Sequence, residues 1–553
     1  MNGRGSVRIN RRRAVGLILF GSPTAVLAAC NKVGTAPSTA PGPTSPVQVT
    51  PTPAGTVAVS QATTPAASAV SPAAGGTLRM GQPFELSSLD GHLGFTGAAD
   101  TLGQVFDRLT EYDDNLAPQP RLAESWEFDA TLTRLKLNLR KNVAFHTGRE
   151  LTSDDIKWNL LRVRDPKTGL TQLAAQSNWW TSIDTPDKYT LVLESDRSRP
   201  FVFDMFESFN ILDPVTMEGP DAKTTAVGTG PFSFTEWVQS DHFSIAKNTN
   251  YWQPNRPLLD GIRVLPFKAQ SALIAQLEAG AIDVAMTPSM MDYARLQKDA
   301  TYGTISNPHS GSVCVVNVNT TFAPLDQKEV RQALSYAMNR QRYIDVYRAG
   351  VGNAQSLPWS AASPAFQAEK NAMFAFDLDT ARSLLKSAGV SNLTLDFVYF
   401  PGNPSEGLAE IYQADLATLG IALNIMPVDP LAWRDLNQIG ALKYKGLSGG
   451  ASGYANFEPI TLLTSSTAWN YTGNSSGYQS DMYSNLVVTA STEPDLTKRK
   501  SAYSVLNDLI LDESFVLTVA PTPEVAVYLA KSAHGLHYSQ HGSIPWANVW
   551  LGA

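Results

Sequence analysis

The stretch "RLKLNLRKNVAFHTGRELTSDDIKWNLLRV" (residues 134–163) changes its hydrophobic period partway along. From Leu135 to Leu139 it alternates leucine with polar residues, which is typical of a half-buried β-strand. A second pattern begins at Thr152, with Asp155 three residues later and apolar residues at helical spacing beyond, which predicts a capped helix. A strand that leads into a helix favours a mixed α/β architecture, and we interpret this stretch as scaffold.

Strand and helix patterns continue to alternate downstream. The residues "QSALIAQLEAGAIDVAM" (270–286) predict a helix that ends at Gly280, followed by a short strand around Ile282 and Val284. The residues "PLDQKEVRQALSYAMNRQRYIDVYRAG" (324–350) predict one long helix with an apolar side. That side carries Val330, Leu334, Ala337 and Met338.

Two further helices are predicted at "DLDTARSLLKSAG" (377–389) and "EGLAEIYQADLATLG" (406–420), each ending at its glycine. Alternating strands follow them, "LTLDFVYF" (393–400) and "IALNIMPV" (421–428). Repeated strand–helix–strand units predict an α/β fold. Roughly 480 residues follow residue 75, which is enough for two or three lobes.

The N-terminal stretch "RRRAVGLILFGSPTAVLAAC" (11–30) has the layout of a cleaved export signal. Three arginines precede an apolar run that is too short to span a bilayer, and small residues precede Cys30. Leu27 to Cys30 resembles the lipobox of bacterial lipoproteins, so we expect residues 1–30 to be the signal and Cys30 to carry lipid. The arginines match the twin-arginine pattern poorly, and general secretory export is favoured over that route.

Residues 31–75 are rich in Pro, Thr, Ala, Ser and Gly and contain no aromatic residue. Such a segment cannot build a core and predicts an extended tether between the lipid and the folded body. The net charge of −7 and the absence of a basic stripe disfavour nucleic-acid binding. With Cys30 lipidated, Cys314 has no disulfide partner, and its apolar neighbours predict a buried thiol.

Several patterns are compatible with an enzyme, but each has a simpler interpretation. Residues 473–477 fit the G-x-S-x-G nucleophile elbow around Ser475, but no buried strand precedes them, so a polar loop is favoured. His534, His537 and His541 lie in an irregular Gly-rich segment, and their spacing alone defines no metal site. Adjacent carboxylates such as Asp154 and Asp155 point apart on a helix, which argues against an acid/base pair. No Walker loop or dinucleotide fingerprint is present.

A series of blocks resembles one known family. "PRLAESW" (120–126) and "LRKNVAFHTG" (139–148) match its signature of the form P-x-L-A-x-S-W and L-R-x-x-V-x-F-H-x-G. Blocks in the expected order surround them. These are "GGTLRMGQPFELSSLDGH" (75–92), "GTGPFSFTEW" (228–237), "NTNYWQPNRPLLDGI" (248–262), "LEAGAIDVA" (277–285), "VRQALSYAMNR" (330–340) and "ARSLLKSAG" (381–389). The chain is similar to solute-binding protein family 5 of ATP-driven importers, which includes oligopeptide, dipeptide and nickel binding proteins.

The resemblance covers the chain from about Gly75 to its C-terminus and implies a type II periplasmic-binding-protein-like fold of three lobes. The first lobe would comprise residues 76–115, 225–310 and 516–553, the second residues 116–224, and the third residues 311–515. One departure from the family is Asn339, where an Asp is usual; we expect it to lie on a helix.

The resemblance also implies how such a protein works. A ligand would be held between the first and third lobes, which close about a hinge. The protein would be an exported monomer with no catalytic activity, cofactor or metal, anchored to the membrane through Cys30. Its partners would be a small solute, such as a peptide or sugar, and a permease with two membrane subunits and their ATPases. Two alternatives remain: a sensor lipoprotein that docks with a receptor, and an exported hydrolase that uses Ser475 or the C-terminal histidines.

By resemblance, the ligand cleft has eight candidate residues. They are Phe95, Ser312, Val313, Trp359, Tyr399, Tyr454, Asn456 and Trp469. Peptide-binding members commonly have an Asp in the stretch that matches "GYANFEP" (453–459), where it pairs the peptide's α-amino group. Here the position falls on Ala455 or Asn456, and neither is charged. A buried ammonium without a carboxylate is costly, so we expect a neutral polar group at this place. The alternative is that Asn456 only caps a turn.

Overall fold

The computed structural model describes residues 72–93, 99–168, 170–307, 309–453, 457–539 and 542–552. The predicted signal with Cys30 and most of the predicted tether lie outside these ranges. Five other residues of interest also lie outside them: Phe95, Tyr454, Ala455, Asn456 and His541. Within the described part of the chain, no helix is long and apolar enough to cross a bilayer.

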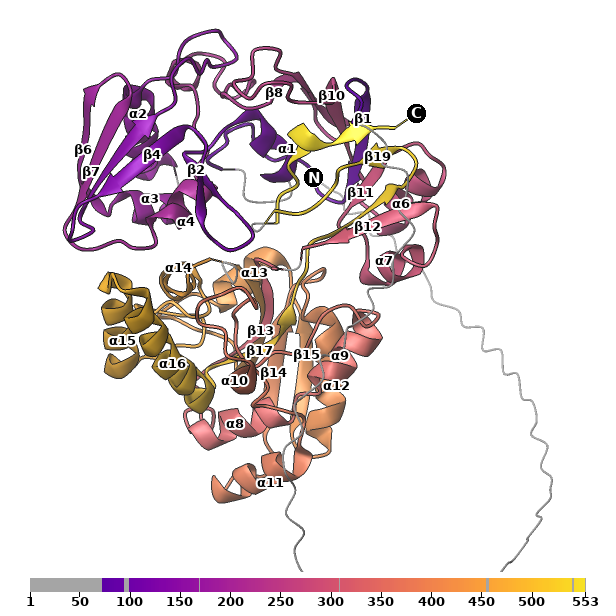
Figure 1. The fold of residues 1–553 in the computed structure, drawn as a ribbon. Helices are drawn as coiled ribbons and strands as arrows, with labels where there is room; N and C mark the ends of the chain where they lie inside the picture. Colours follow the sequence, from indigo (N-terminus) through magenta and orange to yellow (C-terminus); the bar gives the residue numbers. More distant parts are fainter. Residues whose placement is uncertain are drawn as a thin grey trace, which may run out of the picture. The chain divides into compact units, whose positions relative to one another are not determined.

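The described strands form three main sheets, and the largest combines segments from both ends of the body (Figure 1). Its order is β12 (Tyr302–Ser306), β18 (Val525–Leu529), β11 (Val284–Met286), β1 (Thr77–Gln82), β10 (Gly261–Pro266), β9 (His242–Lys247) and β8 (Phe232–Val238). β1 pairs in parallel with β10 and β11, and β18 pairs antiparallel with β11 and β12. Helix α6 (Gln270–Glu278) ends just before Gly280, and β11 follows, as predicted.

A second sheet contains the stretch with which the sequence analysis began. Its antiparallel order is β4 (Ala123–Phe128), β5 (Arg134–Leu139), β7 (Thr190–Ser195) and β6 (Trp180–Asp187). The leucines of β5 are buried, which confirms the alternating strand. Helix α2 (Ser153–Arg162) begins after Thr152, whose backbone N–H donates to Asp155 Oδ2 at 2.7 Å. The predicted capped helix is therefore confirmed.

The third sheet has the order β15 (Ala422–Pro427), β14 (Thr394–Tyr399), β16 (Gly446–Ser452), β13 (Val313–Val318) and β17 (Val516–Pro521). β14 is parallel to β15 and β16, whereas β13 is antiparallel to β16 and β17. Helices α11 (Leu378–Ser387) and α12 (Glu406–Ala417) precede β14 and β15. Each is followed by a glycine with positive φ, Gly389 (+68°) and Gly420 (+76°), as predicted.

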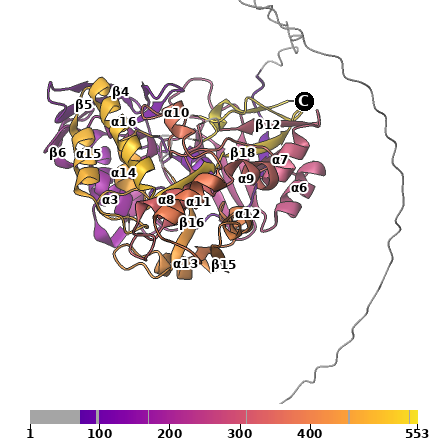
Figure 2. The same ribbon diagram turned by 90° about the horizontal axis from the view of Figure 1, so that it is seen from below.

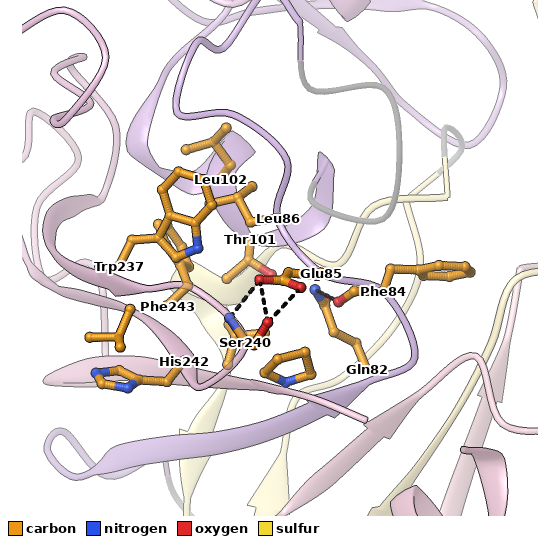
Figure 3. A pocket seen from close by; sticks show the side chains of 13 residues that line it. Gln82, Phe84, Glu85, Leu86, Thr101, Leu102, Trp237, Ser240, His242 and Phe243 are labelled. Atoms are coloured by element: carbon orange, nitrogen blue, oxygen red, sulfur yellow. Dashed lines mark hydrogen bonds between the residues drawn. The ribbon is translucent and has the colours of Figure 1, made fainter. Parts of the chain in front are cut away.

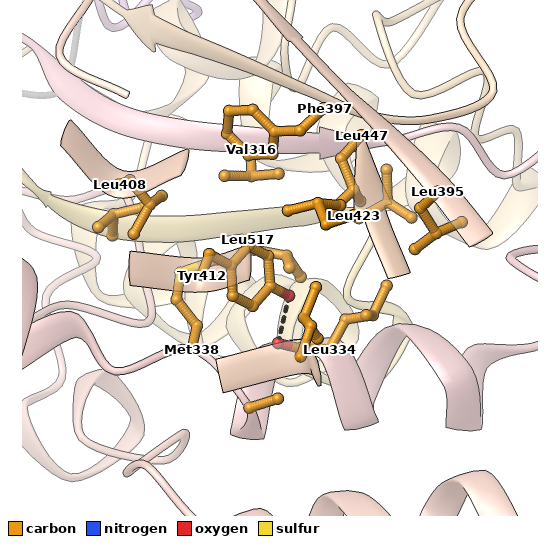
Figure 4. Close-up of a cluster of buried hydrophobic side chains, with 14 of the residues drawn as sticks. Val316, Leu334, Met338, Leu395, Phe397, Leu408, Tyr412, Leu423, Leu447 and Leu517 are labelled. Atoms are coloured by element: carbon orange, nitrogen blue, oxygen red, sulfur yellow. Dashed lines mark hydrogen bonds between the residues drawn. The ribbon is translucent and has the colours of Figure 1, made fainter. Parts of the chain in front are cut away.

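One face of this third sheet packs against α11, α12, α8 (Lys328–Tyr336) and α9 (Arg340–Tyr347). Figure 4 shows the core between them, where the Tyr412 hydroxyl donates to Leu334 O at 2.6 Å. Seen from below, α8 and α11 lie side by side (Figure 2). Cys314 is fully buried in this core, as predicted, and burial raises the pKa of its thiol to about 12. The opposite face carries a second core with α14 (Pro459–Ser465), α15 (Asp481–Thr492) and α16 (Leu496–Glu513).

The single long helix predicted at residues 324–350 is wrong, because α8 and α9 are separate. Asn339 is the N-cap of α9, and its side chain accepts from the backbone N–H of Arg342 at 2.9 Å. Arg340 is buried, and its guanidinium donates to Ser335 O at 2.9 Å and to Thr518 O at 2.7 Å. The contact of Arg340 with β17 therefore stabilises the break between α8 and α9. The predicted apolar side is buried throughout, at Val330, Leu334, Ala337 and Met338.

Shorter elements complete the described fold. The helices are α1 (Ala99–Leu102), α3 (Thr171–Ser177), α4 (Val202–Ser208), α5 (Pro214–Glu218), α7 (Met290–Leu296), α10 (Ala368–Asn371) and α13 (Pro430–Leu436). The 3₁₀ turns are Gly103–Val105, Pro166–Thr168 and Trp546–Asn548. Two small ribbons pair β2 (Thr110–Tyr112) with β3 (Pro118–Pro120) and β19 (Ala533–His534) with β20 (Trp550–Leu551).

Candidate functional site

Several strand ends meet at one edge of the five-stranded sheet. The parallel strands β14, β15 and β16 end there at Tyr399, Pro427 and Ser452. β13 runs the opposite way and begins at the same edge, with Val313 opposite Ser452. Ligands of open α/β sheets bind outside the carboxyl ends of the strands, so this edge is the candidate site.

Two chain segments connect this sheet with the seven-stranded sheet, one from β12 to β13 and one from β17 to β18. They are hydrogen-bonded to each other: Ser310 Oγ donates to Thr522 O at 2.7 Å, and Thr522 N donates to Ser312 O at 2.8 Å. Asn307 Nδ2 donates to Glu524 Oε2 at 2.9 Å, and burial raises the pKa of Glu524 to about 7. A pair of adjacent crossings is the kind of narrow connection about which lobes can hinge.

A cavity of about 690 Å³ opens beside α13, which starts three residues after β15 ends. Its volume lies within the range of about 300–1,000 Å³ that is usual for ligand pockets. The Asp429 carboxylate fixes the start of α13 by accepting from the backbone N–H groups of Leu431 and Ala432, each at 3.0 Å. The lining includes Leu431, Trp433, Asn437, Ile439, Thr467 and Ser475.

Two polar atoms of this lining are buried without a hydrogen-bond partner among the described residues. They are Nε1 of Trp433, a donor, and Oδ1 of Asn437, an acceptor. The Asn437 side chain is oriented by its own Nδ2, which donates to Trp433 O at 2.9 Å. Buried polar groups in folded proteins are nearly always paired, so these two enclosed atoms are exceptions beside the cavity.

The sequence analysis did not identify Trp433 or Asn437. A local signal was present: Asp429-Pro430 directly follows the predicted strand "IALNIMPV", and Asp before Pro is a common helix start. A helix that begins where a parallel strand ends lies at the ligand-binding edge. Trp433 on this helix and Asn437 at its C-cap were therefore candidates for the lining of a cavity.

The described candidates from the sequence divide between the two faces of the sheet. Val313, Trp359 and Trp469 share the core beside α14 to α16, and both indoles are almost wholly buried. Trp359 Nε1 donates to Asn507 Oδ1 at 2.6 Å. Tyr399 belongs to the core on the opposite face. Ser312 lies on the crossing into β13. A ligand role for these residues stays a prediction, as it does for Phe95, Tyr454 and Asn456.

The residues of the alternative hydrolase hypothesis do not converge in the described structure. Ser475 lines the cavity beside α13, and its backbone oxygen accepts from the Tyr444 hydroxyl at 2.6 Å. His534 stacks on Trp550, with ring centroids 5.5 Å apart, and His537 Nδ1 lies 3.1 Å from Gly535 O. Among the described residues, no three His, Cys, Asp or Glu side chains are grouped so that they could hold a metal ion.

Near the candidate loop 453–459, the four-stranded-sheet region contacts α14. The Asp204 carboxylate on α4 accepts from the Tyr112 hydroxyl at 2.8 Å, from the backbone N–H of Glu458 at 3.1 Å, and from the Thr461 hydroxyl. Glu458 in turn pairs with Arg499 at 3.1 Å. A second cavity, of about 700 Å³, lies along this contact.

A third cavity, near the start of the seven-stranded sheet, is too small for a solute. Figure 3 shows its lining, in which the Glu85 carboxylate accepts from the backbone N–H of Ser240 at 2.5 Å, and Gln82 Nε2 donates to Phe84 O at 2.8 Å. Its volume of about 20 Å³ corresponds to roughly one water molecule. Of these three cavities, the two of ligand size are therefore the one beside α13 and the one along the contact between the four-stranded-sheet region and α14.

The overall architecture matches solved binding proteins. The periplasmic binding protein DppA of Helicobacter pylori, associated with an ABC transporter and solved with the peptide STSA, superposes with a TM-score of 0.75. The match covers 87% of this chain and 99% of that chain at 22% identity. The three sheets and the paired crossings thus define the fold of a type II periplasmic binding protein, as predicted.

The family follows from the sequence comparison. The model of the bacterial extracellular solute-binding proteins, family 5, matches residues 117–470, and the chain belongs to this family. Heme-binding protein A of Haemophilus influenzae is 26% identical over 406 residues, which cover 67% of this chain and 73% of that protein. The dipeptide-binding protein of Pseudomonas aeruginosa is 26% identical over 477 residues, which cover 79% and 87%. The predicted family is confirmed.

Proposed function

We propose that this chain is an exported, lipid-anchored protein that captures a small polar solute and delivers it to an ABC permease with its ATPases. The observation that carries the proposal is the pair of hydrogen-bonded crossings that joins the five-stranded and seven-stranded sheets, in a chain of the extracellular solute-binding family. The relatives are named for ligands as different as heme and dipeptides, so the fold alone does not select the solute.

Capture would proceed by lobe closure about the two hydrogen-bonded crossings. The solute stabilises the closed state only by as much as it binds that state more tightly than the open one. The permease would then recognise the closed form. This mechanism requires no bond to be made or broken, so the protein acts as a binding protein.

The uncharged residues at Ala455 and Asn456 support a solute that is not held by a free α-amino group. An ammonium buried there would lack a carboxylate partner, which costs more than burying a neutral polar group that is hydrogen-bonded. A peptide, a sugar derivative or another small polar molecule with an uncharged group at this place fits the proposal.

The test of capture is mass spectrometry of small molecules released by denaturing the full-length protein after purification from its membranes. We expect one solute at near-stoichiometric amount, and adding it back to stripped protein should raise the thermal midpoint by mass action. Protein that carries no solute, and that no panel of peptides and sugars stabilises, would contradict the proposal.

The lipid anchor has a separate test, because the chain has two cysteines. In cells fed an alkyne fatty acid, the wild type and the Cys314→Ala variant should both incorporate the alkyne label. The Cys30→Ala variant should stay unlabelled. The Cys30→Ala protein should also move from the membrane fraction to the soluble fraction. Equal labelling of all three proteins would rule out Cys30 as the lipidated residue.

A further inference from the structure

We propose that Asp204 and Phe201 form a latch that holds the four-stranded sheet and its helices to the five-stranded-sheet region, and that this latch stabilises the closed lobes. The inference rests on the proposed function in one respect, that the lobes close about the paired crossings. It goes further by assigning two residues away from the crossings that set the balance between the open and the closed arrangement.

The path of the chain shows why this contact must open when the lobes separate. The four-stranded sheet and α4 lie between β1 and β8 in sequence, and both of these strands belong to the seven-stranded sheet. His146 N also donates to Gly228 O, just before β8, at 2.9 Å. The five-stranded sheet is linked to the seven-stranded sheet by the two crossings. A rotation about the crossings therefore carries the four-stranded sheet with the seven-stranded one, and the contact with α14 is made or broken.

The Asp204 carboxylate is the polar part of the latch. The residue is 1% exposed, and on its own side the carboxylate accepts from the Tyr112 hydroxyl at 2.8 Å. Across the contact it accepts from the backbone N–H of Glu458 at 3.1 Å and from the Thr461 hydroxyl. The ion pair of Glu458 with Arg499, at 3.1 Å, fixes this receiving end to α16. Separating the regions would break both bonds across the contact, so the closed arrangement gains them.

The Phe201 ring is the apolar part of the latch. Phe201 directly precedes α4, yet it is 3% exposed within the core that α14, α15 and α16 form on the five-stranded sheet. Trp179, from the same side of the contact as α4, packs edge-on against it, with ring centroids 5.1 Å apart and planes at 78°. Opening would return this apolar surface to water, which is unfavourable. The cavity of about 700 Å³ beside the ring interrupts the contact, which suits an arrangement that opens again.

Protonation of Asp204 strengthens the latch. The charged and titratable side chains around Asp204 and its partner Glu458 are Tyr112, Glu207, Arg499 and Tyr503. Glu207 pairs with Arg108 at 3.1 Å on the same side as Asp204, so its bonds do not cross the contact. Burial raises the pKa of Asp204 to about 8, whereas an Asp exposed by opening titrates near pH 4. The closed arrangement therefore holds a proton between about pH 4 and pH 8 that the open one releases, and the latch weakens as pH rises through this window.

The experiment measures a distance across the contact in the full-length protein in detergent, by pulsed electron resonance between two spin labels. A ketone-bearing amino acid carries the labels at the exposed positions of Asn115 and Lys500, which line the cavity from opposite sides, so both cysteines stay unlabelled. We expect a short-distance population in the wild type at pH 5 that falls at least about threefold by pH 9.

Matched variants identify the bonds that hold the short distance. Asp204→Ala and Thr461→Val should each reduce its population at pH 5 at least about threefold. Asp204→Asn can still accept from the Glu458 N–H and should keep the short distance at both pH values. Thr464→Val is the control, because the Thr464 hydroxyl donates to Ile460 O within α14, at 2.7 Å, and not across the contact. Far-ultraviolet circular dichroism shows that each variant is folded.

The outcomes separate this inference from the proposed function. No short-distance population in the wild type at pH 5, a population that grows as pH rises, or one that Thr461→Val leaves unchanged would each overturn the latch. If Asp204→Ala does not fold, Thr461→Val and the pH response of the wild type decide. A captured solute with distances that ignore these changes keeps the import proposal and removes the latch. Distances that respond as expected in a protein that captures no solute do the reverse.

Discussion

At the scale of single residues, Asn507 illustrates how a polar side chain holds two parts of a core together. It is fully buried on α16, its oxygen accepts from Trp359, and its Nδ2 donates to Ala365 O at 2.8 Å. Asn507→Ala leaves the indole N–H and the carbonyl unpaired, so we expect a loss of about 2–4 kcal/mol in the free energy of unfolding. Denaturant unfolding measures this, and Asn485→Ala, at an exposed position of α15, should change the free energy of unfolding by less than about 0.5 kcal/mol. A loss below about 1 kcal/mol for Asn507→Ala would contradict this role.

Residue-level prediction succeeded where local chemistry decides the outcome. The buried state of Cys314 follows from its apolar neighbours, and the cap formed by Thr152 and Asp155 follows from their spacing. The unpaired atoms of Trp433 and Asn437 could not be found in this way. Whether a side-chain atom is buried without a partner depends on neighbours far away in the chain, here Phe400 and Gly450.

At the scale of elements, the boundary between α8 and α9 depends on the cap at Asn339. Asn339→Ala removes the acceptor for the first turn of α9, so we expect a loss of about 1 kcal/mol in unfolding free energy. Asn339→Ser retains a capping oxygen and should recover most of it. The comparison is made by thermal or denaturant unfolding. An alanine variant as stable as the wild type would show that the contacts of Arg340 alone hold the break.

The elements that were predicted correctly have strong local signals at their ends. α11, α12 and α6 are each followed closely by a glycine with positive φ, a conformation that costs little only for glycine, and a short strand follows each of them. The break between α8 and α9 has no glycine or proline, and its apolar period runs straight through it. The signs of the break are the N-cap residue Asn339 and the burial of Arg340 against β17. The contact between Arg340 and β17 is long-range and is absent from a local pattern.

At the scale of the whole molecule, Asp204 joins two of the sheet-based regions and makes stability depend on pH. Burial raises the pKa of Asp204 to about 8, and burial also raises that of Glu207 to about 8. In the unfolded chain both groups titrate near pH 4. Between about pH 4 and pH 8 the folded chain therefore keeps protons that the unfolded chain has released. Stability is greatest at the acidic end of this window and falls as pH rises through the folded pKa.

The corresponding variant is Asp204→Asn, which has no proton to lose. We expect the thermal midpoint of the wild type to fall between pH 5 and pH 9, and the variant to show about half of that fall, because Glu207 still contributes. Asp379→Asn, at an exposed carboxylate, serves as the matched control and should follow the wild type. A wild-type midpoint that rises across this range would show that the sign is wrong.

The position of β18 in the seven-stranded sheet means that this sheet cannot be completed until the end of the chain has been synthesised or exported. Among the described strands, β12 pairs with β18 and with no other, and β18 also closes one side of β11. A ribosome or a translocation channel releases β11 and β12 long before Val525 emerges. Until then both strands have open edges, which invite pairing with other chains. Any stop upstream of β18 therefore yields an aggregation-prone fragment, and a holding chaperone would have to cover these edges until the last strand arrives.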